Sequence, residues 1–276
     1  MQSVTMLEPI IAAAAVASPE NPGDYVQDGL LYCGQCKTPK QSRQNIMGHM
    51  ITVSCLCQCA TQRRDAEEAE RRKEQEADRI MRLRSAGIAS QAFRNVRFEQ
   101  DDGKNAATAT VRRYAEKWEE VSRKNIGLLL YGGVGTGKSF SAACLANYLI
   151  DRKVPVCMTN LSGILNGIQW EDKNEFIDDL AKYPLLILDD FGMERQTEYA
   201  LEQVFNVVET RYRSGKPLVI TTNLSLSEMK NPKSRDHARI YDRVLEMCAP
   251  VNFGNSGRRS AISVEKIQQA AQILRG

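Results

Sequence analysis

Short apolar runs alternate with longer, mixed segments through the second half of the chain. Apolar runs at residues 126–131, 154–159 and 218–222 are typical of buried strands in a parallel sheet. The segments between them have the composition or spacing of helices, as at 140–149 and 198–214. We expect further helices at 111–123, 161–170, 175–183 and 234–247, an apolar strand at 185–188 and a final strand at 249–253. This alternation predicts an α/β fold with a parallel sheet.

A highly charged segment precedes this region. Residues 63–84 contain eight basic and seven acidic side chains, and pairs such as Glu67/Arg71 and Glu68/Arg72 have the i, i+4 spacing that supports an exposed helix. Its apolar content is low, so we interpret it as a spacer helix between modules. A coiled coil or a partner-binding arm is the alternative.

A phosphate-binding loop pattern lies between the strand at 126–131 and the helix at 140–149. It reads Gly132-Gly133-Val134-Gly135-Thr136-Gly137-Lys138-Ser139 and fits G-x-x-x-x-G-K-[ST] without a mismatch. Glycines let the backbone fold around phosphates and offer N–H groups at a helix N-terminus, where the dipole favours anions. Lys138 is expected to reach the β- and γ-phosphates, and the Ser139 hydroxyl is expected to hold Mg²⁺. The flanking strand and helix argue against a chance match in a Gly-rich turn.

Polar side chains follow two of the predicted strands. Asp189 and Asp190 come directly after the apolar run at 185–188, at the strand end where open α/β sheets bind ligands. Asp189 is expected to ligate Mg²⁺, directly or through water, and Asp190 to polarise the attacking water. Asn223 ends the strand at 218–222, where it could orient water against the γ-phosphate. A turn or helix cap is an equally ordinary use of Asn223.

Five of the eight cysteines lie between positions 33 and 59. Cys33 and Cys36 form a C-x-x-C knuckle, which can wrap two thiolates around one Zn²⁺. Cys55, Cys57 and Cys59 compete for the second pair, with His49 as an outside candidate. We prefer Cys55 and Cys57, with Cys59 as the alternate. A structural zinc ribbon is the favoured interpretation, against free or redox-active thiols. Its mildly basic charge does not decide between DNA and protein as its partner.

Composition adds limits rather than detail. The 276 residues are 42% hydrophobic and 26% charged, which suits one α/β domain and a smaller appendage. The net charge is only +3, but from position 211 onward there are 12 Lys/Arg against 5 Asp/Glu. Such an excess suits nucleic acid or phosphate contact, or a solvated basic face. The apolar run at 10–17 lacks a preceding basic residue, and no window has membrane-spanning length, so we expect a soluble, cytoplasmic protein.

Taken together, the order of these motifs resembles the DnaC/IstB-like family of AAA+ ATPases, which comprises replicative helicase loaders and transposition helper ATPases. The resemblance covers about residues 87–259. It depends on the loop at 132–139, the sequence at 185–192, and shorter matches at 221–224, 239–243 and 254–258. The cysteine-rich leader looks like that of phage-type and Gram-positive-type loaders. The expected organisation is a flexible leader at 1–30, a zinc-binding module at 31–62, a charged linker helix at 63–86 and a P-loop AAA+ ATPase domain at 87–276.

The resemblance also implies roles for individual residues. Asn223 falls at the sensor 1 position, Arg243 at the arginine-finger position and Arg258 at the sensor 2 position. An arginine supplied by a neighbouring subunit implies a homo-oligomer when ATP is bound, with weak, assembly-dependent hydrolysis. Two departures stand out: Asp190 occupies a position where many relatives have Glu, and Gly257 stands where a tyrosine is usual. Because Arg259 follows directly, it competes with Arg258 for the sensor 2 role.

The function implied by the resemblance is ATP-driven loading of a replicative helicase onto single-stranded DNA, with ATP, Mg²⁺ and Zn²⁺ as cofactors. A transposition helper ATPase has the same catalytic machinery and a different client. A nucleotide-gated zinc adaptor with little turnover is the non-enzymatic alternative. Asp190 is the reason to consider it, because many relatives have Glu at this position. A metabolic P-loop kinase is disfavoured, since it would need neither Arg243 nor the zinc module.

Overall fold

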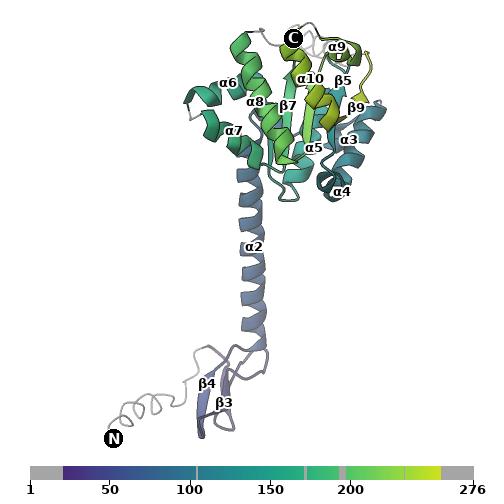
Figure 1. The fold of residues 1–276 in the computed structure, drawn as a ribbon. Coiled ribbons are helices and arrows are strands. Elements are labelled where there is room, and N and C mark those ends of the chain that lie inside the picture. The colour runs from purple at the N-terminus through teal and green to yellow at the C-terminus, as the bar shows by residue number, and fades with distance from the viewer. Residues whose placement is uncertain (1–20, 104, 171–172, 193–196, 233, 256–276) are drawn as a thin grey trace, which may run out of the picture. The chain divides into compact units, whose positions relative to one another are not determined.

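The computed structural model describes residues 21–255 apart from 104, 171–172, 193–196 and 233 (Figure 1). The chain divides into two compact units, Met1–Ala77 and Asp78–Gly276. Helix α2, Gln58–Gly87, begins in the first unit and ends in the second. Among the described residues, no helix combines the length and the apolar character that a membrane crossing requires.

The second unit contains a five-stranded parallel sheet with the strand order β6-β7-β8-β5-β9. Its strands are β5 (Gly127–Tyr131), β6 (Val156–Asn160), β7 (Leu185–Phe191), β8 (Leu218–Thr222) and β9 (Cys248–Asn252). The predicted α/β fold with a parallel sheet is therefore confirmed. The order places β8 between β5, which leads into the phosphate loop, and β7, which carries the two aspartates. Parallel strands end at one edge, so these functional segments meet there.

Helices cover both faces of this sheet (Figure 1). Successive residues of β5 point to opposite faces: Leu128 and Leu130 belong to one buried cluster, and Leu129 belongs to the other. The first cluster includes α3 (Ala106–Glu116) and α5 (Lys138–Ile150). The second includes α6 (Leu161–Trp170), α7 (Lys173–Lys182), α8 (Glu198–Ser214), α9 (Leu226–Lys230) and α10 (Arg235–Met247). Both faces are buried, which explains why the strand sequences are apolar without alternation.

One expected helix is broken. The segment 111–123 falls into α3 and the short α4, Trp118–Arg123, which meet at Lys117. Tyr114 and Trp118 still face each other, with ring centroids 6.3 Å apart. The Tyr114 hydroxyl donates to the Ile126 carbonyl at 2.7 Å, so the end of α3 is attached to the start of the sheet. Two 3₁₀ turns, Gln91–Phe93 and Phe98–Gln100, connect α2 to α3.

The first unit consists of two antiparallel ribbons and the start of α2. Strand β1 (Tyr25–Gln27) pairs with β2 (Leu30–Tyr32), and β3 (Gln41–Ile46) pairs with β4 (His49–Ser54). Strand β1 lies inside the segment we expected to be a flexible leader. Asp24 explains this order, because its carboxylate accepts from the Gly34 N–H at 2.9 Å and from Lys40 Nζ at 2.6 Å. The observed module thus includes residues from 24 onward.

Candidate functional site: a nucleotide site and a cysteine cluster

The predicted phosphate loop connects β5 to α5 at the carboxyl edge of the sheet. Gly132 has a φ of +143°, and a Cβ on it would lie 2.6 Å from the Gly254 carbonyl oxygen, so a larger residue does not fit. The Gly133 N–H donates to the same oxygen at 2.8 Å. Gly137 precedes α5 with a φ of +99° and has open space where a Cβ would be. The loop is thus close-packed on one side and open at the N-terminus of α5, where an anion would bind.

Lys138 lies inside this loop. Its side chain is only 5% exposed, and Nζ donates to the carbonyls of Gly132 at 2.9 Å and Gly133 at 2.7 Å. Nζ also donates to Asn223 Oδ1 at 2.8 Å. The lysine ammonium therefore connects the phosphate loop to the end of β8. A buried ammonium is a suitable counter-charge for a phosphate.

Asn223 does not cap a helix. The N-cap of α9 is Ser225, which forms a capping box with Glu228. The helix-cap interpretation is therefore wrong, and the amide oxygen of Asn223 instead accepts from the lysine of the phosphate loop.

The two aspartates occupy different environments. Asp189 is half-buried, and desolvation raises its pKa, against hydrogen bonds from Thr221 and Ser139 that lower it. Its Oδ1 accepts from the Thr221 hydroxyl at 2.6 Å. Asp190 is exposed, with a φ of +54°, at an irregularity in the pairing of β7 with β8. The structure thus brings Asp189 to Ser139, the two side chains that we predicted to share Mg²⁺, and turns the Asp190 backbone away from regular strand geometry.

Sequence reasoning missed two residues of this site. Thr221 was only part of a matched motif, yet its hydroxyl touches Asp189 and accepts from the Asp190 N–H at 2.9 Å. Asn105 was not considered, although its Nδ2 donates to the Thr136 and Phe253 carbonyls, each at 3.2 Å. Asn105 caps α3, which begins at Ala106, whereas we expected this helix to begin at position 111, so the N-cap signal of Asn105 was missed. Its second role depends on tertiary contacts.

Arg243 lies apart from the loop residues, on the α10 face that packs against α8. Its Nε donates to Glu209 at 3.2 Å, Nη1 donates to Glu246 at 3.3 Å, and its guanidinium stacks 4.3 Å from the Tyr212 ring centroid. The Arg243 side chain is 34% exposed and is held by these contacts within its own subunit. The other arginine expected at the nucleotide, Arg258, and its competitor Arg259 lie outside the described residues.

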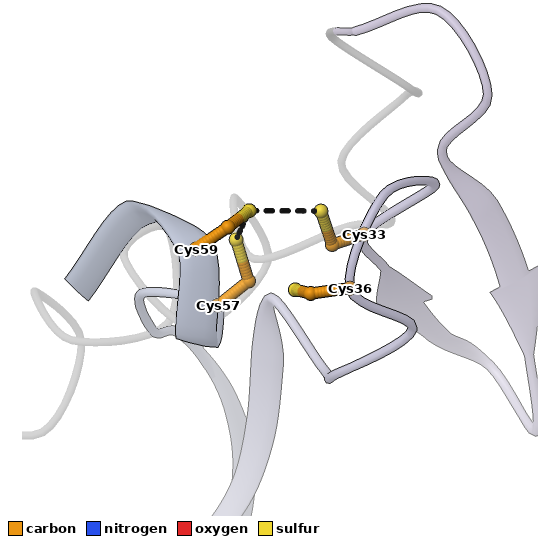
Figure 2. A group of neighbouring side chains, drawn as sticks. All are labelled: Cys33, Cys36, Cys57 and Cys59. Carbon is orange, nitrogen blue, oxygen red and sulfur yellow. Dashed lines mark hydrogen bonds between the residues drawn. The ribbon is translucent and has the colours of Figure 1, made fainter. Parts of the chain in front are cut away.

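The first unit brings four cysteines together. The sulfurs of Cys33, Cys36, Cys57 and Cys59 all lie within 4.8 Å of one another (Figure 2). Cys33 and Cys36 come from the turn after β2, and Cys57 and Cys59 lie at the start of α2. Four thiols at this separation, from two turns, fit a tetrahedral zinc site.

The prediction that Cys55 is a zinc ligand is wrong, because Cys55 lies outside the cluster. It is exposed, and its sulfur lies 3.6 Å from the Pro39 carbonyl, outside the cluster. The cause is the early start of α2: its first turn contains Cys59 and directs that side chain back toward the knuckle, whereas Cys55 still follows β4. Cys59, the alternate, thus completes the set.

Local hydrogen bonds stabilise thiolates in the knuckle. The Thr38 hydroxyl, 3.0 Å from the sulfur, is the main reason that the pKa of Cys36 falls to about 5. The backbone N–H groups of Cys36 and Gln35 lower the pKa of Cys33. Thiolate is the form that binds metal, so these bonds prepare the knuckle for it.

Comparison with known proteins places this geometry in context. The model of a family described as IstB-like ATP binding protein matches residues 41–265. The replicative helicase loader DnaI of Bacillus subtilis is 29% identical over 153 residues, which are 49% of this chain and 48% of that protein. The replicative helicase loader DnaC of Buchnera aphidicola (Schizaphis graminum) is 26% identical over 184 residues, 62% of this chain and 72% of that protein. A crystal structure of DnaI aligns with 64% of this chain and 99% of the crystallised one, with a TM-score of 0.54 and 22% identity, which supports the fold.

Proposed function

Because the chain belongs to the family of IstB-like ATP-binding proteins, we propose that it hydrolyses ATP to load a replicative helicase onto single-stranded DNA. The observation that carries the proposal is the convergence of Lys138, Asn223 and Asp189 at the phosphate loop. The helicase is suggested by the names of the DnaI and DnaC relatives. The aligned part spans about half the length of the Bacillus relative. The helicase client and the DNA are therefore part of the proposal.

Within this proposal, the loop N–H groups and Lys138 bind the phosphates, and Asn223 orients the γ-phosphate through its contact with Lys138. Ser139 and Asp189 fit a magnesium ion, because a hydroxyl and a half-buried carboxylate are already hydrogen-bonded to each other there. The ion would neutralise charge on the phosphate oxygens. Asp190 is exposed beside Asp189 and would accept a hydrogen bond from the attacking water.

The arginine finger adds a requirement for assembly. Arg243 would leave Glu209 and Glu246 and reach the nucleotide of a neighbouring copy, which makes hydrolysis depend on a homo-oligomer. Arg258 would contact the γ-phosphate in its own subunit. Zn²⁺ would occupy Cys33, Cys36, Cys57 and Cys59 and hold the small first unit together. A reducing cytoplasm is the compartment that suits these free thiols.

Substitution of the loop lysine tests the proposal. Lys138→Ala removes the ammonium that faces the phosphate site, and we expect ATP binding and helicase loading to be lost together. Equilibrium binding of ATP and loading of a replicative helicase onto single-stranded DNA are the two measurements. Full loading by Lys138→Ala would defeat the mechanism.

A transposition helper ATPase is the second candidate, favoured by the IstB-like family description. Co-purification separates the two: recovery of a replicative helicase without a transposase supports loading, and the reverse supports the helper. A nucleotide-gated adaptor is the third candidate, because the shorter Asp190 carboxylate stands where Glu is more common. Tight ATP binding without turnover, with and without single-stranded DNA, would favour the adaptor.

A further inference from the structure

A single buried hydroxyl lies between the two aspartates of the candidate site. Thr221 is the next-to-last residue of β8 and Thr222 is the last, and both are fully buried. The Thr221 hydroxyl donates to Asp189 Oδ1 at 2.6 Å and accepts from the Asp190 N–H at 2.9 Å. One side chain on β8 thus contacts both acidic residues of β7, as donor to one and as acceptor to the other.

The contact with Asp189 fixes a carboxylate that has apolar surroundings. A small cavity lined by Asp189, Leu188, Phe191 and three helical residues lies beside it. These apolar walls offer no hydrogen bonds, so the orientation of the carboxylate depends on its few polar contacts, among them the hydroxyls of Thr221 and Ser139. The short bond from Thr221 keeps Oδ1 turned toward β8. Groups that orient a metal ligand in this way commonly change metal affinity by about 10–100-fold.

The contact with Asp190 fixes the backbone. Regular pairing of β7 with β8 runs from Leu186 to Leu188, shifts, and resumes at Phe191 with Thr222. Asp190 has a φ of +54° in this interval, a backbone conformation that residues other than glycine rarely adopt. Its backbone N–H donates to the Thr221 hydroxyl, so this N–H has a side-chain acceptor at the irregularity. That bond helps to hold the irregularity that leaves the Asp190 side chain exposed.

We propose that Thr221 is the positioning residue of the magnesium and nucleotide site, its single hydroxyl orienting the Asp189 carboxylate and holding the Asp190 backbone. This role depends on the proposed function in one respect, namely that Asp189 is the acidic ligand of the nucleotide-bound magnesium ion. Thr221 itself touches neither nucleotide nor metal.

The chain offers a matched control for the test. Thr222 is equally buried on the same strand, but its hydroxyl donates to the Phe191 carbonyl at 2.7 Å and accepts from the Leu224 N–H at 3.1 Å. Thr221→Val and Thr222→Val therefore remove the same group from neighbouring positions, and only the first touches the aspartates. Thr221→Ser keeps the hydroxyl and removes the methyl group.

The experiment measures binding of a fluorescent ATP analogue to the full-length chain, once with excess Mg²⁺ and once with a chelator of Mg²⁺. The readout is the ratio of the two dissociation constants, which needs no turnover. We expect Thr221→Val to reduce the gain in affinity from Mg²⁺ by about tenfold, while binding without Mg²⁺ stays as in the wild type. Thr221→Ser and Thr222→Val should keep the wild-type ratio. Thermal unfolding of all variants reports loss of fold separately.

Three results would overturn the proposal. A wild-type gain from Mg²⁺ in Thr221→Val would show that the hydroxyl does not position Asp189. An equal loss in Thr221→Ser or Thr222→Val would assign the effect to packing on β8. Equal dissociation constants of the wild type with and without Mg²⁺ would refute the magnesium site and with it the proposed ATP chemistry. If the ratio of dissociation constants behaves as expected but the wild type does not load a helicase, only the proposed helicase client is refuted.

Discussion

The strongest structural prediction concerns Arg211, a guanidinium buried at the amino ends of β7 and β8. It is 1% exposed and donates to the carbonyls of Ala181, Tyr183, Pro184 and Pro217 at distances of 2.6–3.3 Å. Burial lowers its pKa to about 10, so it stays protonated at neutral pH and keeps all its donors. Arg211 thus holds together the turns that precede the two strands of the candidate site.

The cost of removing it follows from these acceptors. Arg211→Met leaves the carbonyls of Tyr183, Pro184 and Pro217 without this donor, whereas the Ala181 carbonyl still accepts from Lys216 Nζ at 2.9 Å. Each lost contact costs about 1 kcal/mol, because two of the three are only partly buried and water can reach them. The expected loss is roughly 3 kcal/mol, which for a unit of this size lowers the melting temperature by about 10 °C. Methionine keeps most of the apolar volume, so a cavity does not dominate the loss.

Differential scanning calorimetry of the full-length chain measures this shift. Arg213→Met is the control, since that side chain is 77% exposed and makes one surface ion pair with Glu209. Its cost should stay below about 1 kcal/mol. If Arg211→Met melted within about 2 °C of Arg213→Met, the carbonyl contacts would not carry the stability assigned to them.

Two further predictions concern the metal cluster and the arginine finger. Cys59→Ser should abolish stoichiometric zinc, measured by atomic emission on the purified chain, whereas Cys55→Ser should retain it, because only Cys59 lies in the cluster. The opposite pattern would return Cys55 to the ligand set. Arg243→Ala should reduce assembly-dependent ATP turnover by roughly 10³-fold without changing ATP affinity. Arg213→Ala, which removes the other partner of Glu209, is its control. Equal turnover in both variants at every protein concentration would refute the finger.

The parts of the molecule that the sequence predicted well are those whose signals are continuous along the chain. The phosphate loop needs only eight consecutive residues between a strand and a helix, so its geometry is local. Asp189 was found because a buried strand delivers its last residues to one edge of a parallel sheet. The helix Glu198–Ser214 was predicted with its observed bounds, because Thr197 caps its start and Gly215 ends it.

The parts that escaped prediction depend on contacts between distant segments. Thr221 acquires its role from the register of β8 against an irregular stretch of β7, which no pattern within either strand encodes. The choice between Cys55 and Cys59 depended on where α2 begins, and helix starts are uncertain by a turn when several polar residues could cap them.

The basic excess from position 211 onward includes side chains with partners inside the fold. Arg211 is buried among carbonyls, Arg239 stacks 4.3 Å from the Phe205 ring centroid, and Arg243 is paired with acids. Charge counted along the chain does not distinguish a cation that faces a partner from one that holds two elements of its own fold together. The excess is therefore weaker support for nucleic acid contact than its size suggests.

The strand order explains why β8 contains so many of these contacts. A strand placed between the phosphate-loop strand and the acidic strand can contact both through its last residues. Thr221, near the end of β8, contacts Asp189 of β7. Asn223, directly after β8, contacts Lys138 of the phosphate loop. Arg211 fixes the other end of β8 through the Pro217 carbonyl. A displacement of the whole of β8 would therefore disturb the carboxylate and the lysine together. Arg211→Met, which loosens the other end of the strand, should change Mg²⁺ dependence and nucleotide affinity in a coupled way, whereas Thr221→Val, which removes one contact, should change Mg²⁺ dependence alone.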